Sequence, residues 1–249
     1  MLTDTHCHIF NEYYDDFDKV INDAKSNCVT RFINNATNID NCKEVIITSR
    51  NDNNIYYSLG VHPDSVENDL EELEKLVVEN LNDKKFVAIG EIGLDYHYGK
   101  ENRERQIEVF EFQLGLAEKY NLPVIVHSRE ATQDTLDCIK KFKVKGVLHC
   151  FSGSLEIARE YMKLGFYFGV NGVITFKNAK LKDVIKEIPL NHILLETDCP
   201  YLTPEPFRKY SNEPKYILTI AEFLANLYEI SLDEVKKITE ENVFNLFDI

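Results

Sequence analysis

Two histidines stand one residue apart near the start of the chain, in the stretch TDTHCHIF at 3–10. If this stretch is an extended strand, residues i and i+2 point to the same face. The Cβ atoms of His6 and His8 then lie roughly 6.5–7 Å apart, which is two strand rises. Two imidazoles at that spacing can bind one cation. Seven histidines occur in 249 residues, so chance can produce one such pair and a metal site needs further ligands.

Five further histidines and carboxylates, residue types that bind metal ions, each lie at or near the end of a short apolar run. These residues are His62, Glu91, His127, His149 and Asp198. A single histidine or carboxylate in such a place is often a hydrogen-bonded core residue. Imidazoles and carboxylates that meet at one point would instead bind divalent cations. Whether they meet depends on the elements that carry them.

Eight short apolar or β-branched runs have the composition of buried strands. They span residues 2–8, 30–36, 55–62, 86–92, 123–128, 146–151, 166–172 and 192–198. Amphipathic stretches separate them, and the clearest helices are predicted over 65–81 and 105–121. Ser231 followed by Glu234 predicts a capping box at the start of the last helices.

This alternation of strand and helix predicts parallel strands joined by helical crossovers. Eight such units in about 250 residues fit a closed barrel. The sequence contains no linker, low-complexity segment or internal repeat. We therefore expect an α/β protein with a single-domain (β/α)8 TIM-barrel fold over residues 1–249.

Chemistry in such barrels lies at the carboxyl ends of the strands, which places the candidate ligands on one rim. The expected metal ligands are His6, His8, Glu91, His127, His149 and Asp198. This set exceeds the three protein ligands of a catalytic zinc, and two cations bridged by one carboxylate would use it fully. Glu91 is the expected bridge, because it comes from the fourth strand, between the two groups of histidines.

The composition restricts the partners and the compartment. The net charge of −14 argues against a broad nucleic-acid-binding surface, which relies on many lysine and arginine contacts to phosphate. No apolar run is long enough to span a membrane, and we recognise no signal peptide. The six cysteines show no paired spacing, which favours reduced thiols and a cytoplasmic protein. Nothing indicates a membrane or an obligate protein partner.

Several motifs, in order along nearly the whole chain, resemble those of the TatD-type metal-dependent deoxyribonucleases. The matching stretches are DTHCH, GVHPD (60–64), IGEIGLDY (89–96), RQIEVFEFQLGLAEKYNLPVIVHSRE (105–130), GVLHCFSGS (146–154), ETDCPYLTPEPFR (196–208) and NEPKYI (212–217). This family is a TIM barrel in the amidohydrolase-like group. The resemblance implies two divalent metals and hydrolysis of phosphodiesters, expected as a 3′→5′ exodeoxyribonuclease on single-stranded DNA.

The resemblance also assigns roles to residues of this sequence. It implies that His6, His8, Glu91 and Asp198 hold one ion, and that Glu91, His127 and His149 hold the other. We expect catalysis through a metal-bound hydroxide, with Glu91 and Asp198 as catalytic residues and Asp198 as a candidate proton acceptor.

Two further positions correspond to family residues near the substrate, His62 in GVHP and Arg129 in HSR, and both are expected to bind its phosphate. Tyr201 and Phe207 are candidates for stacking on a base. The expected ions are zinc, manganese or magnesium, and the imidazoles favour zinc, manganese or iron over magnesium.

Other functions stay open at this point. A hydrolase of cyclic amides or esters would use the same site chemistry, although many such enzymes bridge their metals with a modified lysine on the fourth strand. A D-aminoacyl-tRNA deacylase is a second alternative. A metal-binding scaffold without activity is a third, but it leaves the open coordination positions without a use.

Overall fold

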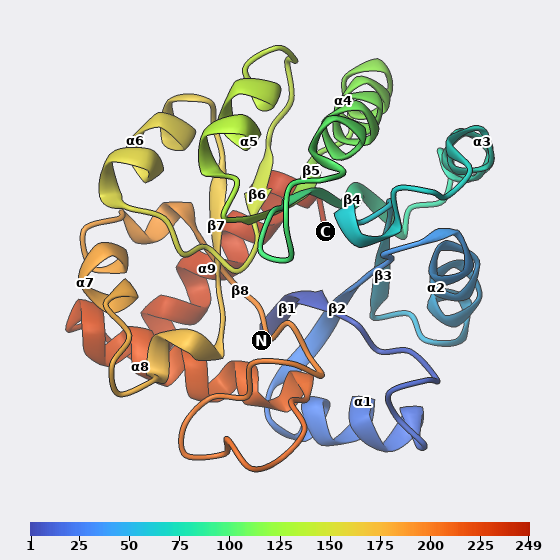
Figure 1. The fold of residues 1–249 in the computed structure, drawn as a ribbon. Helices are drawn as coiled ribbons and strands as arrows, with labels where there is room; N and C mark the ends of the chain where they lie inside the picture. Colours follow the sequence, from blue (N-terminus) through green and yellow to red (C-terminus); the bar gives the residue numbers. More distant parts are fainter.

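The computed structural model describes residues 1–249 and shows eight parallel strands that pair in sequence order. Helices surround the strands, and the chain ends are marked in Figure 1. The strands are β1 (Leu2–Cys7), β2 (Val29–Asn35), β3 (Ile55–Leu59), β4 (Phe86–Asp95), β5 (Val124–Arg129), β6 (Gly146–Leu148), β7 (Tyr167–Val170) and β8 (Ile193–Leu195). The predicted (β/α)8 TIM barrel is confirmed. Every helix is too short or too polar to cross a lipid bilayer.

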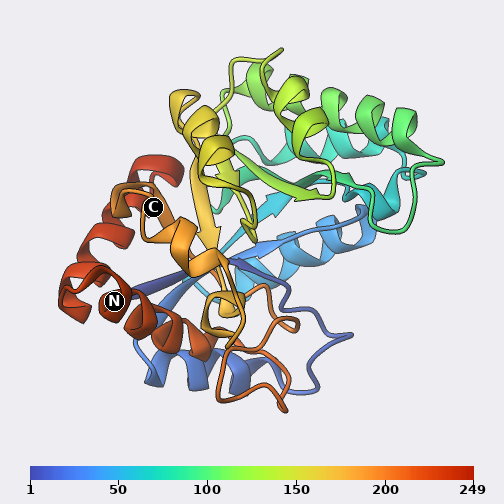
Figure 2. The same cartoon turned by 60° about the vertical axis from the view of Figure 1, so that its left-hand side comes forward.

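Nine α-helices and four short 3₁₀ turns connect or follow the strands. The helices are α1 (Phe17–Ser26), α2 (Ile39–Asn51), α3 (Leu70–Asn80), α4 (Arg103–Tyr120), α5 (Thr132–Ile139), α6 (Leu155–Lys163), α7 (Leu181–Ile185), α8 (Ile217–Tyr228) and α9 (Leu232–Phe247). The 3₁₀ turns are η1 (Pro63–Ser65), η2 (Gly172–Thr175), η3 (Leu190–His192) and η4 (Pro214–Tyr216). Figure 2 shows the same arrangement from a second direction.

The first residues of α3 and α9 can be compared with the helix starts predicted from the sequence. The helix predicted over 65–81 begins only at Leu70, because the Asp69 side chain accepts the N–H groups of Glu71 and Glu72 and so caps it there. The predicted cap at Ser231 is confirmed, since its hydroxyl accepts the N–H of Glu234 at 3.2 Å. Local capping chemistry therefore sets both boundaries.

The inner face of the barrel changes from apolar to polar along β5 and β6. On β5, Ile125 is two residues before His127, and at β6 Val147 is two residues before His149, so each pair shares the inner face. Ile125 and Val147 belong to a buried cluster that also contains Phe247 of α9. The amino-terminal end of the barrel is thus filled with apolar side chains, and the polar side chains gather at the opposite end.

Hydrogen bonds between β1 and the segment after β8 close the barrel beside the first histidines. The Asp198 N–H donates to the His6 carbonyl and the His8 N–H donates to the Cys199 carbonyl, both at 2.9 Å. The Thr5 hydroxyl donates to the Leu195 carbonyl at 2.9 Å. Closure therefore places Asp198 next to both histidines, although β8 itself ends at Leu195.

Two glutamines of α4 hold the ends of neighbouring strands. Gln113 accepts the Val61 N–H at 2.7 Å and donates to the Val61 carbonyl at 3.0 Å. Gln106 pairs in the same way with the backbone of Asp95, with both bonds at 2.9 Å. Both glutamines are buried. The glutamine side chains take the place of the backbone hydrogen-bond partners that Val61 and Asp95 do not find in the sheet. They thereby hold the backbone next to His62 and at Asp95 in position.

Substitution Gln113→Leu leaves the N–H and the carbonyl of Val61 buried without partners. We expect the free energy of unfolding to fall by roughly 2–4 kcal/mol, since each orphaned group costs about 1–3 kcal/mol. The melting temperature should fall by about 2–4 °C for each kcal/mol. Calorimetry checks this, with Gln133→Leu on the exposed face of α5 as the control. An equal effect of the two substitutions would contradict the role of Gln113.

Candidate metal centre

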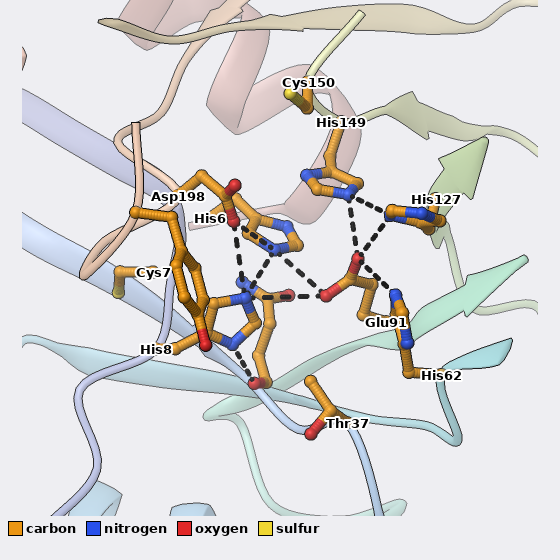
Figure 3. Close-up of polar contacts among 12 residues, drawn as sticks. His6, Cys7, His8, Thr37, His62, Glu91, His127, His149, Cys150 and Asp198 are labelled. Carbon is orange, nitrogen blue, oxygen red and sulfur yellow. Dashed lines mark hydrogen bonds and ion pairs between the residues drawn. The ribbon is translucent and has the colours of Figure 1, made fainter. Parts of the chain in front are cut away.

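Seven predicted site residues converge at the carboxyl end of the barrel (Figure 3). They are His6, His8, His62, Glu91, His127, His149 and Asp198. Three lie within strands, and the others follow strand ends by one to three residues. The strands supply rigid positions, and the short extensions turn the remaining side chains toward the same point.

Glu91 lies at the centre, and its two carboxylate oxygens face different histidines. Oε2 lies 3.3 Å from His6 Nε2 and 3.5 Å from His8 Nε2. Oε1 lies 2.8 Å from His149 Nε2 and 3.1 Å from His127 Nδ1. The side chain is almost fully buried. One carboxylate therefore faces two groups of nitrogen ligands, which is the arrangement that a bridging ligand needs.

The first group consists of His6, His8 and Asp198. The Nε2 atoms of the two histidines are 3.1 Å apart, and Asp198 Oδ1 lies 3.7 and 3.5 Å from them. His8 Nδ1 is 2.9 Å from the Asn35 carbonyl and donates to it, so Nε2 faces the group and offers its lone pair when the ring is neutral. This tautomer suits a metal ligand.

The second group consists of His127 and His149. His127 Nδ1 is 3.0 Å from His149 Nε2, and His127 Nε2 is 3.0 Å from Asp95 Oδ2. The carboxylate of Asp95 therefore keeps a hydrogen on Nε2, so the neutral ring directs its Nδ1 lone pair toward Glu91. Asp95 is a site residue that we did not predict. It lies four residues after Glu91 on β4, on the same face of an extended strand, and this spacing was the available signal.

His62 lies beside the second group and is distinguished from it by its hydrogen bonds. His62 Nδ1 accepts the Asp64 N–H at 3.2 Å, while Nε2 is 3.6 Å from Glu91 Oε1. The nitrogen atoms of His62 and His127 and a Glu91 oxygen are close enough to share an ion. However, an occupied Nδ1 lone pair places the hydrogen of a neutral imidazole on Nε2, which then donates. This favours a substrate contact for His62.

A close approach of two strands at Gly93 allows β4 to lie against β5 at the site. Gly93 has φ +147°, and a Cβ there would lie 1.9 Å from the His127 carbonyl oxygen. Only glycine fits such a position without moving one of the strands. Glu91 and Asp95, which flank it, consequently reach His127 from the same strand.

A second layer of carboxylates lies behind the ligands. Asp4 accepts the Thr197 N–H at 2.9 Å, and Glu196 accepts the Cys150 N–H at 2.6 Å. Glu196 Oε2 and the Nδ1 atoms of His6 and His149 are buried without hydrogen-bond partners. Glu196 is therefore the carboxylate placed to orient these two imidazoles from behind.

A cavity of about 460 Å³ opens the centre to solvent. It is lined by 15 residues, among them Phe10, Tyr13, Asp64, Tyr98 and Tyr201. Arg129 also lies on it, with its guanidinium 5.6 Å from the Tyr98 ring centroid and in none of the ion pairs of the structure. The predicted arginine is thus free to bind an anion. Phe207, in contrast, stacks on Tyr216 at 4.8 Å, so the sequence-based expectation that it stacks on a base is not supported.

The protonation of the centre reflects its buried charges. Burial lowers the pKa of His6 to about 4 and that of His62 to about 3. Burial also opposes charge on His8 and His127, but the carboxylates of Asp198 and Glu91 for His8, and of Asp95 and Glu91 for His127, raise both pKa values to about 9.

Comparison with known protein families identifies relatives described as metal-dependent hydrolases, in agreement with a metal-binding site here. A family model described as TatD related DNase matches residues 3–248. The chain belongs to the TatD family. It is 43% identical over the full length of both chains to YabD of Bacillus subtilis, described as an uncharacterized metal-dependent hydrolase. It is 36% identical to YcfH of Escherichia coli K12, with the same description, over 100% of this chain and 96% of that one.

A solved structure of this family has the same fold. The crystal structure of YjjV, a TatD homologue from Escherichia coli K12, superposes with a TM-score of 0.93 at 33% identity. The match covers 100% of this chain and 98% of YjjV. The protein is therefore a metal-dependent hydrolase of the TatD family.

Metal binding to the protein should release protons. In the metal-free protein at pH 7, His8 and His127 are charged, because their pKa values lie near 9. An imidazole ligand must be neutral, so loading both groups with Zn²⁺ should expel about two protons from these histidines, in addition to the proton that a bound water loses on becoming hydroxide. Titration calorimetry in two buffers of different ionisation enthalpy measures this number. The release should diminish above pH 9, and no release at pH 7 would contradict this account.

Substitution Asp95→Asn should weaken metal binding at the second group. An amide oxygen accepts the His127 Nε2–H more weakly than a carboxylate does, so the ring is oriented less firmly and its Nδ1 is less basic. Partners of this kind contribute roughly 10- to 100-fold in metal affinity. Competition with a chelator of known affinity measures the change. Asp137→Asn, on exposed α5, is the control. Unchanged affinity of both ions in Asp95→Asn would contradict the positioning role.

Proposed function

We propose that this TatD-family hydrolase cleaves phosphodiester bonds, as a 3′→5′ exodeoxyribonuclease that acts on single-stranded DNA. The observation that carries the proposal is the division of contacts around Glu91, because two-ion sites clamp both the attacking and the leaving oxygen of a phosphoryl displacement. The family description adds DNA as the substrate.

The donor set fits two divalent ions. His6, His8 and Asp198 offer two nitrogens and an oxygen to one position. His127 and His149 offer two nitrogens to the other, and Glu91 offers one oxygen to each. Imidazole and carboxylate ligands of this kind suit zinc and manganese better than magnesium.

Each residue around the centre has a definite task in this reaction. Ions held by these residues would supply a hydroxide nucleophile at neutral pH and would neutralise charge on the phosphate. Hydrogen bonding to His8 outweighs burial and lowers the pKa of Asp198, so this carboxylate stays ionised and is placed to accept the proton of the attacking water. Arg129 binds two phosphate oxygens in parallel. The Nε2–H group of His62 donates to a third.

The fourth strand offers no support to the main alternative. Hydrolases of cyclic amides in this barrel class often bridge their metals with a modified lysine on this strand, but β4 has the sequence FVAIGEIGLD and contains no lysine. The D-aminoacyl-tRNA deacylase alternative is distinguished by assay rather than by the site. The cytoplasmic location expected from the cysteine spacing stays a prediction.

Substitution Glu91→Ala tests the proposal, since it removes the carboxylate whose two oxygens face the two groups. We expect the second ion to be lost and the turnover of a 3′-labelled single-stranded oligonucleotide to fall by at least about 100-fold. Metal analysis after dialysis and a gel assay measure the two effects. Glu104→Ala, exposed in the first turn of α4, is the control.

The outcomes of the assay separate the candidate functions. Cleavage of the oligonucleotide that a chelator abolishes would support the nuclease. Full metal content and full turnover in Glu91→Ala would contradict the bridging role. Turnover of dihydropyrimidines or of D-aminoacyl-tRNA alone, with no DNA cleavage, would overturn the proposed function.

A further inference from the structure

A second cavity of about 380 Å³ adjoins the metal centre, and we call it the side cavity. We call the cavity of about 460 Å³ that opens the centre to solvent the main cavity. The residues that line both cavities, and so form their border, are His127, Arg129, His149, Asp198 and Tyr201. The other walls of the side cavity come from the segments after β6, β7 and β8 and from the start of α7. The metal centre therefore lies between two cavities, so a substrate can extend from it in two directions.

The walls of the side cavity are mainly apolar beyond this shared border. They include Phe151, Val173, Leu181 and Leu202. Phe151 is buried and packs on Phe168, with ring centroids 4.6 Å apart, so it forms a rigid wall. The only charged lining residues are Arg129, Asp198 and the titratable histidines at the border. The interior thus offers nothing to a phosphate, and it suits an uncharged flat group attached to one.

The polar atoms of the interior are mostly engaged with the protein. The Asn171 amide donates to Glu196 Oε1 at 3.3 Å, and its oxygen accepts the Val173 N–H at 3.1 Å. The Ser128 hydroxyl is 2.9 Å from that of Thr135. Ser152 is exposed at the rim. With few free donors and acceptors, the side cavity can hold an aromatic ring by contact with little preference between bases.

The main cavity has a different lining that suits a longer, hydrated part of the substrate. Tyr13 is 40% exposed and Tyr98 is 81% exposed, and both line it. Tyr201, 52% exposed, lies on the border between the cavities, and its ring centroid is 6.2 Å from that of Tyr13. Exposed tyrosines at such an opening are suited to stacking on unpaired bases.

We propose that the side cavity binds the base of the 3′-terminal nucleotide, while the preceding nucleotides leave the centre through the main cavity. This inference rests on the proposed phosphodiesterase function. In the reaction, the oxygen of water bonds to phosphorus and the P–O3′ bond to the preceding nucleotide breaks. The O3′ atom takes a proton, and a nucleoside 5′-monophosphate remains in the side cavity. The cavity volume is near the lower end for small-molecule sites and admits one nucleoside, so each cleavage would release one nucleotide.

Direct binding of a product tests this assignment without turnover. The metal-loaded protein is titrated with thymidine 5′-monophosphate and, separately, with deoxyribose 5-phosphate, which lacks the base. We expect the nucleotide to bind roughly 10-fold more tightly or better, because contact with one base contributes about that much. Leu181→Trp fills the side cavity and should reduce nucleotide affinity to that of the sugar phosphate. Affinity for deoxyribose 5-phosphate should change less than about 2-fold.

Two further variants show whether an effect of Leu181→Trp comes from filling the side cavity or from misfolding. The binding results also distinguish a failure of the side-cavity inference from a failure of the proposed function. Val173→Trp should act like Leu181→Trp, and Ile47→Trp, exposed on α2, should have no effect. Equal binding of the two phosphates to the wild-type protein would overturn the side-cavity inference, even if DNA is cleaved. A preference for the nucleotide that both tryptophan variants abolish would support it, even if DNA is not cleaved and the proposed function fails.

Discussion

The structure depends on one buried carboxylate at the mouth of the barrel. A charge buried in an apolar fold is costly unless oppositely charged or hydrogen-bonding groups surround it. Glu91 meets this condition through nitrogens from β1, β5 and the segments after β3 and β6. Its pKa lies well below the usual range, because the surrounding histidines outweigh burial. These strands must keep their relative positions for the ligands to meet, so barrel closure and site assembly are the same requirement.

The alternation of strand side chains lets one face serve stability and chemistry in turn. Ile125 and Val147 fill the barrel interior, and the next inward positions are His127 and His149. Without this apolar layer, the imidazoles would have no side chains packed beneath them inside the barrel. Phe247 of α9 belongs to the same buried cluster and packs at the amino-terminal end of the barrel. The candidate metal ligands are therefore held by packing against the apolar layer and by hydrogen bonds to neighbouring polar groups.

The sequence predicts the barrel and the convergence of the ligand-type residues because both follow from period-two patterns and strand order. It does not predict where β8 ends, since Asp198 is placed by hydrogen bonds to β1 rather than by its own strand. Asp95 was missed because the predicted fourth strand stopped at 92, whereas β4 continues to Asp95. The side cavity joins segments distant in sequence, and no local pattern indicates such a volume.

The acidic composition and a nucleic-acid substrate are compatible if binding depends on few contacts. The net charge is −14, and α3, with the sequence LEELEKLVVEN, lies at the periphery of the barrel in Figure 1. Solvent-exposed charges more than about 8 Å apart are largely screened at physiological salt. Affinity would then come from the ions, Arg129 and His62 at the phosphate and from contacts with one base. A long basic track is unnecessary for an enzyme that holds only the end of its substrate.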